Sequence, residues 1–105
     1  MKVEILYFSG CPNHASAVDR VREVLEQEGA PADMVEVEVR DASTAEMVGF
    51  LGSPTIRING RDVEHAARAA RGFGLMCRTY IDDGQRAGVP PRKLIRAAVR
   101  EAREG

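Results

Sequence analysis

The chain begins with a short, almost unbroken run of apolar and aromatic residues from Val3 to Phe8, which predicts a strand covered on both faces. Residues 15–28 then carry their apolar side chains on one helical face, which indicates an amphipathic helix. From Met34 to Arg40, valines alternate with charged residues, as in a strand near a sheet edge with one face in solvent. Because a strand, a helix and a strand in this order form a right-handed crossover, the two strands should pair in parallel.

The middle of the chain predicts a short helix and a hairpin. The helix is expected over residues 44–51, with Ser43 or Thr44 as its N-terminal cap. An alternating strand at 56–58 leads into an Asn-Gly pair, the strongest short hairpin signal in the chain, and residues 62–64 form the return strand.

Residues 65–84 have no clear period. The alanine- and arginine-rich stretch at 65–71 favours one or two helical turns. Residues 75–81 are expected to form a strand or a packed loop, and residues 82–84 to form a turn. After a pair of prolines, a last amphipathic helix is predicted to run to about Glu104, with a stripe of arginines on a solvated side.

Length and composition indicate one globular domain over residues 1–105, with 44% hydrophobic and 30% charged residues. No stretch is apolar for the roughly 18 residues of a membrane span, and no basic region precedes an apolar run at the N-terminus, so a cytoplasmic protein without membrane contact is expected. Residues 1–52 carry 4 basic and 10 acidic side chains and residues 53–105 carry 11 and 6. This asymmetry indicates either mutual attraction of the two halves or a basic face that binds anionic small molecules. Few aromatic residues and a net charge of -1 disfavour nucleic acid as a partner.

The residues after the first strand carry the main candidate chemistry. Ser9 and Gly10 end the strand and Pro12 suits the first position of a helix, so Cys11 is expected to cap that helix. Unpaired N–H groups and the helix dipole would favour a thiolate there, and His14 could add a positive charge or a hydrogen bond to the sulfur. The alternative is that Cys11 is an inert buried residue and His14 a solvated one. A cysteine in an exposed turn favours the reactive interpretation.

Cys11 and Cys77 are the two cysteines of the chain, too few for a disulfide scaffold. In a reducing compartment such a pair is typical of catalytic, redox or metal-binding proteins. Two thiolates with His14 as a further ligand would suit a soft metal ion or a mercurial, and Cys-x-x-His is half a zinc site. A metal site of Cys11, Cys77 and His14 is therefore an alternative to redox chemistry.

The order strand, helix, strand, helix, strand, hairpin and terminal helix resembles the thioredoxin-like superfamily, and two motifs support the likeness. The segment Cys11-Pro12-Asn13-His14 looks like that superfamily's active-site Cys-x-x-Cys, with His14 in the place of the second cysteine. The segment Ser53-Pro54-Thr55 looks like its cis-proline loop. The resemblance implies an α/β fold with a mixed four-stranded sheet in the order 2-1-3-4, helices on both faces and an insertion before the last helix.

Within the superfamily, Gly10 to Asn13 and Cys77 to Tyr80 are similar to segments of small bacterial proteins described as thioredoxin- or glutaredoxin-like, some of them labelled alkylmercury lyase. The resemblance implies that Pro54 is cis and lies beside Cys11. It also implies a substrate groove formed by Pro12, Ser53, Pro54 and Thr55, in which the Ser53 backbone can pair with an extended substrate as an added strand.

Because His14 replaces the second cysteine, the resemblance leaves two ways to resolve a mixed disulfide: Cys77, folded back over Cys11, or glutathione as a co-substrate. Cys77 could equally be a buried, inert thiol. Arg71 or Arg78 could stabilise the Cys11 thiolate.

We therefore expect a thiol–disulfide redox protein with Cys11, His14 and Cys77 as catalytic residues and no resident cofactor. Its partner would be a thiol or disulfide substrate, either a protein or a small molecule. The chain would be a monomer, or a homodimer formed through its exposed valine-rich strand. The alternatives are a soft-metal or mercurial binding protein and an interaction module with vestigial cysteines.

Overall fold

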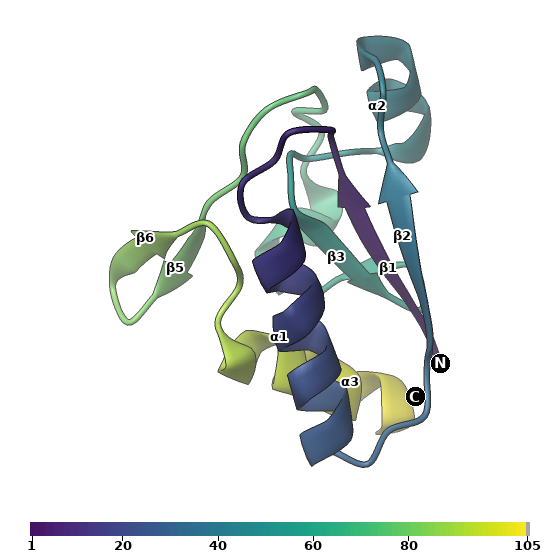
Figure 1. Cartoon of the computed structure of the whole chain (residues 1–105), viewed down its shortest axis with the longest axis vertical. Coiled ribbons are helices and arrows are strands. Elements are labelled where there is room, and N and C mark those ends of the chain that lie inside the picture. The colour runs from purple at the N-terminus through teal and green to yellow at the C-terminus, as the bar shows by residue number, and fades with distance from the viewer. Residues whose placement is uncertain (105) are drawn as a thin grey trace.

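The computed structural model describes residues 1–104, which form a mixed sheet with helices on both faces (Figure 1). Strands β1 (Lys2–Tyr7), β2 (Asp33–Glu38), β3 (Thr55–Ile58) and β4 (Arg61–Asp62) lie in the order β2-β1-β3-β4. Strand β1 pairs with β2 in parallel and with β3 antiparallel, and β3 pairs with β4 antiparallel. The predicted α/β class, mixed sheet and strand order are confirmed.

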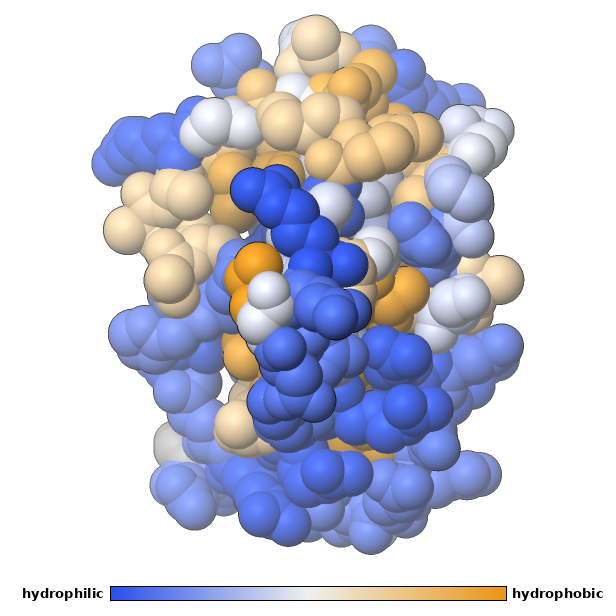
Figure 2. All heavy atoms as spheres, turned by 90° about the vertical axis from the view of Figure 1, so that its left-hand side faces the viewer, coloured by the Kyte–Doolittle hydropathy of each residue, from blue (hydrophilic) through white to orange (hydrophobic). Residues whose placement is uncertain are grey.

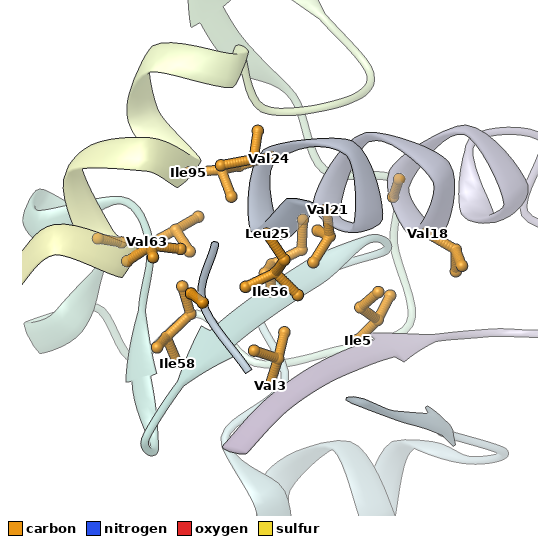
Figure 3. Packing of buried hydrophobic residues seen from close by; sticks show 14 of the residues in the cluster. Val3, Ile5, Val18, Val21, Val24, Leu25, Ile56, Ile58, Val63 and Ile95 are labelled. Atoms are coloured by element: carbon orange, nitrogen blue, oxygen red, sulfur yellow. The ribbon is translucent and has the colours of Figure 1, made fainter. Parts of the chain in front are cut away.

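Helices α1 (His14–Gln27) and α3 (Arg92–Glu104) cover one face of the sheet, and the short α2 (Ala42–Val48) packs on the other. Successive side chains of a strand point to opposite faces, so Val3 and Ile5 of β1 join the core under α1 while Leu6 joins the core under α2. Figure 3 shows the larger core, in which side chains of α1 and α3 meet those of β1 and β3. No helix within residues 1–104 is both long enough and apolar enough to cross a membrane.

The edge position predicted for the second strand is confirmed, since β2 has a neighbour only in β1. Its valine face is less buried than the alternation predicts, because Val35 is 42% exposed. Helix α2 is only 7 residues long and packs through Ala45 against Leu6, Val39 and Phe50. It therefore covers the carboxyl end of the sheet and leaves Val35 uncovered.

The N-terminal cap of α2 is Asp41, so the prediction of Ser43 or Thr44 was wrong. The Asp41 carboxylate accepts a hydrogen bond from the Thr44 backbone N–H at 2.7 Å. A cap side chain typically accepts from the backbone N–H three residues later, as here. This hydrogen bond lowers the pKa of Asp41. The helix ends at Val48, and its C-cap residue Gly49 has the left-handed conformation with a φ of 69°.

Residues 65–91 form the predicted insertion before the last helix. It contains a 3₁₀ helix, η1 (His65–Ala69), and a separate hairpin of β5 (Tyr80–Asp82) and β6 (Gln85–Ala87). The hairpin projects from the side of the molecule in Figure 1, away from the main sheet. The turn at its tip is predicted by the sequence, but β6 is not.

The opposite charges of the two halves meet between α1 and α3. The carboxylate of Glu28 accepts hydrogen bonds from Arg100 at 2.9 Å and Arg103 at 2.7 Å, and Arg96 lies 3.6 Å away. Arg92 donates to Glu23 at 2.6 Å. The arginine stripe thus forms ion pairs across the helix interface.

Glu28→Gln is expected to reduce the loss of thermal stability that occurs when the pH falls from 7 to 3. The hydrogen bond from Arg100 lowers the pKa of Glu28 below its ordinary value of 4.5, so its carboxylate stabilises the fold above that pH. This contribution disappears as the pH falls through the lowered pKa. Unfolding midpoints measured at pH 7 and pH 3 should therefore differ more for wild type than for Glu28→Gln. The exposed Glu26→Gln is the matched control, and an unchanged pH profile in Glu28→Gln would contradict the assignment.

Candidate functional site

Cys11 lies on the loop between β1 and α1, partly exposed, with its backbone N–H bonded to the Phe8 carbonyl at 3.2 Å. Helix α1 begins at His14 with Asn13 as its cap residue, so the prediction that Cys11 caps the helix was wrong by two positions. Pro12 and Asn13 form a turn instead, closed by a bond from the His14 N–H to the Cys11 carbonyl at 3.4 Å.

The side chain of Asn13 makes no capping hydrogen bond and packs against Gly88, the residue after β6. A Cβ atom at Gly88 would overlap the Asn13 amide nitrogen. The Cys11 loop therefore contacts the end of the insertion, and a larger residue at position 88 would have to move the Asn13 side chain.

The His14 ring contacts residues of the two strands at the sheet edge, β1 and β2. It stacks on Tyr7 with 3.6 Å between ring centroids, and its Nε2 lies 2.6 Å from a carboxylate oxygen of Glu36 on β2. The ring thus joins the first turn of α1 to strands β1 and β2. The role of His14 toward the Cys11 sulfur stays a prediction.

Ser53 and Pro54 lie between α2 and β3, and the peptide bond between them is cis. The Ser53 hydroxyl oxygen accepts a hydrogen bond from the Phe8 N–H at 3.4 Å, which ties this loop to the end of β1. The Ser53 N–H donates to the Met76 carbonyl at 2.8 Å, and the Ser53 carbonyl accepts from the Arg78 N–H at 3.0 Å.

These two backbone bonds make a parallel bridge between Ser53 and Cys77. The backbone that the resemblance offers to an extended substrate is therefore already paired with the chain's own residues 76–78. Pro54 and Thr55 are buried, whereas Pro12 is exposed.

Arg78 holds the paired segment in place. Its guanidinium is buried and makes a bidentate contact with Asp62, at 2.7 and 2.9 Å. It also reaches Glu64 at 3.2 Å and the Thr55 hydroxyl at 3.2 Å. Burial alone would lower the pKa of Arg78, but its hydrogen bond to Asp62 leads the effects that raise it. The Arg78 guanidinium is thus paired with residues before the insertion and is not a free cation for Cys11.

Tyr80 completes the attachment of the insertion. Its ring lies under the Arg78 guanidinium, 4.5 Å from the ring centroid, and its hydroxyl donates to the Pro54 carbonyl at 2.5 Å. Burial raises the pKa of Tyr80, so the hydroxyl remains a donor. The Thr55 hydroxyl donates to the Gly52 carbonyl at 2.6 Å, which fixes the same loop from within.

Cys11 and Cys77 are both free thiols, the first partly exposed and the second exposed. Hydrogen bonds connect both cysteines to the Ser53–Pro54 loop. Phe8 bonds to the Cys11 N–H and to the Ser53 hydroxyl, and the Ser53 backbone pairs with Cys77. In Figure 1 the loop after β1 and the segment before β5 lie at the same end of the molecule. Cys77 is therefore not the buried thiol of the inert interpretation.

A hollow of about 530 Å³ lies beside this loop, lined by Phe8, Ser9, Glu38, Val39, Arg40 and Leu75. Leu75 and Met76 are two of the exposed apolar residues, with exposed fractions of 44% and 41%. Figure 2 shows orange and cream surface at this end of the molecule and mostly blue surface at the other. The sequence does not predict the hollow, because its walls come from three segments that are distant in sequence.

The three residues of the alternative metal site do not come together as a ligand set. Within residues 1–104, no group of three or more histidine, cysteine, aspartate or glutamate side chains could hold a metal ion. The ring of His14 contacts Glu36 and Tyr7 instead.

A family model described as "Domain of unknown function (DUF2703)" matches residues 13–99. The matched range includes Ser53, Pro54 and Cys77 and begins two residues after Cys11. Neither the curated proteins nor the solved structures include a significant match to the chain.

Proposed function

The chain belongs to the DUF2703 family, and from its own site we propose that it is a thioredoxin-like thiol–disulfide redox protein with Cys11 as nucleophile. One observation carries the proposal: the partly exposed Cys11 bonds to Phe8, which bonds to Ser53 of the cis Ser53–Pro54 loop, and the exposed Cys77 pairs with the same Ser53. The strand order and the loop before α1 agree with the resemblance of the sequence to that superfamily.

In the proposed reaction the Cys11 thiolate attacks a substrate disulfide. The substrate S–S bond breaks, a bond forms between Cys11 and one substrate sulfur, and the other substrate sulfur leaves as a thiolate. The Cys77 thiolate then attacks the Cys11 sulfur and releases the second substrate thiolate. If glutathione attacks instead, Cys11 is left in a mixed disulfide with glutathione, and a second glutathione releases the Cys11 thiolate and leaves as oxidised glutathione. With Cys77 the substrate gains two electrons, and the protein is left with a Cys11–Cys77 disulfide.

The remaining site residues support this chemistry by position. His14 anchors the first turn of α1 through Tyr7 and Glu36, which holds the loop that carries Cys11. The Ser53–Pro54 loop holds the Cys77 segment through Tyr80 and the Ser53 backbone. The protein needs no resident cofactor in this scheme.

The products of oxidation test the proposal. After incubation with oxidised glutathione and alkylation of free thiols, wild type is expected to contain a Cys11–Cys77 disulfide, seen as the loss of two hydrogens in the intact mass. Cys77→Ser should instead accumulate one glutathione on Cys11.

A glutathione adduct on Cys11 of wild type would select glutathione over Cys77 as the resolving thiol. Unmodified wild type would contradict redox chemistry. Stoichiometric binding of mercury, lost in either cysteine variant, would then favour the soft-metal alternative.

A further inference from the structure

The Ser53 edge has no free backbone group for an added strand. Its N–H and its carbonyl are both bonded to residues 76–78, at 2.8 and 3.0 Å. A peptide that binds by strand addition needs these main-chain partners, and they supply most of its affinity. An extended polypeptide must therefore displace the chain's own segment before it can reach this edge.

Displacement would break more than two backbone bonds. The segment is tied down by the bidentate Arg78–Asp62 pair and by the bond from Tyr80 to the Pro54 carbonyl. It also sits tightly on Gly52, where a Cβ atom would lie 3.0 Å from the Met76 carbonyl oxygen and from the Arg78 Cβ. Removing Arg78 from Asp62 would leave a buried charge without its partner, which is costly.

The hollow beside the Cys11 loop remains open. Its wall residue Phe8 accepts the backbone bond of Cys11, so a group bound there lies next to the loop that carries the sulfur. Its volume of about 530 Å³ is large enough to accept a small organic group.

The charge of the hollow selects the kind of group that binds. Glu38 and Arg40 form an ion pair at 3.0 Å, so the two charged residues of the lining cancel. Phe8, Val39 and Leu75 are apolar. A neutral, apolar group therefore fits better than glutathione, which carries two carboxylates, because no uncompensated cation faces it.

We propose that the substrate of Cys11 is a small disulfide with a neutral apolar substituent that binds in this hollow, and that extended polypeptides are excluded by residues 76–78. This inference rests on the proposed redox function and narrows its substrate class. The reaction is the exchange described above: Cys11 takes the sulfur that bears the apolar group, and the other substrate sulfur leaves as a thiolate.

Three disulfides test the substrate class. In each, methanethiol is joined to a second thiol, which is benzyl mercaptan, glutathione or the cysteine of an extended ten-residue peptide. In the Cys77→Ser variant, mass spectrometry follows the rate at which each disulfide forms an adduct on Cys11. Each rate is divided by the rate at which the same disulfide reacts with a free model thiol, which removes differences in intrinsic reactivity. The benzyl compound is expected to react about tenfold faster than the other two. Equal normalised rates for all three would overturn the inference while leaving the redox function intact, and no reaction with any would overturn both.

Two variants in the same background test the two structural causes separately. Leu75→Glu puts a charge into the hollow and should remove the benzyl preference, whereas Ile81→Glu, 58% exposed on β5 and outside the hollow, should keep it. Tyr80→Phe removes one tie of the segment and should raise the relative rate of the peptide. Equal effects of Leu75→Glu and Ile81→Glu, or an unchanged peptide rate in Tyr80→Phe, would overturn the corresponding cause.

Discussion

Cys11→Ser is expected to lower the rate of exchange with a small disulfide by more than about a hundredfold, because a serine hydroxyl cannot replace the thiolate as nucleophile. Cys11 lies on the loop next to the hollow, and its loop is fixed by Phe8 and by the Asn13–Gly88 contact. The measurement is the second-order rate constant for thiol release, with circular dichroism to show that the variant is folded.

Cys77→Ser is the matched control, since it removes the other free thiol of the chain. The first exchange step should persist in this variant, and the mixed disulfide should accumulate because its resolving thiol is absent. If Cys11→Ser keeps its rate and Cys77→Ser loses it, then the exposed Cys77 is the nucleophile and the proposed roles are reversed.

The regular part of the fold could be predicted because its signals are local. The apolar faces of residues 15–28 and of the last helix recur at helical spacing, and the Asn-Gly pair after β3 fixes the hairpin. The ends of elements are harder to predict, because several neighbouring residues can each act as the cap. Asp41 lies close to Ser43 and Thr44 in sequence, and only the backbone geometry shows which one caps α2.

The presence of the insertion could be predicted, but its contacts could not, because they join residues that are distant in sequence. Arg78 pairs with Asp62, 16 positions earlier, and Tyr80 bonds to Pro54, 26 positions earlier. Neither pair leaves a periodic pattern. The segment also changes the candidate site: the sequence offers Ser53 as a free strand edge, and the folded chain pairs that edge with residues 76–78.

These contacts connect the stability of the insertion to the accessibility of the site. Arg78 contributes its backbone N–H to Ser53 and its guanidinium to Asp62. A change that releases the guanidinium should therefore also loosen the backbone bridge next to Cys77. If extended substrates are excluded as proposed, stability and substrate choice both depend on Arg78.

Asp62→Asn is expected to reduce the free energy of unfolding by about 3–5 kcal/mol, because it removes one partner of a buried ion pair and leaves the other charge in place. Both side chains of the pair are only 6% exposed. Glu64, at 3.2 Å from Arg78, can compensate only in part, since its own side chain is 34% exposed. Urea unfolding of wild type and variant at pH 7 gives the difference.

The exposed Asp83→Asn is the control, since Asp83 also forms an ion pair but its side chain is 87% exposed, and little change in unfolding is expected there. The double variant Asp62→Leu, Arg78→Met removes both buried charges and should regain much of the loss, because neither charge is then left unpaired. Hydrogen exchange at the Ser53 and Arg78 amides supplies the link to the site: both should exchange faster in Asp62→Asn, under conditions where the core amides of α1 remain protected. Fast exchange at these two amides in wild type itself would mean that the Ser53 edge is open to extended substrates.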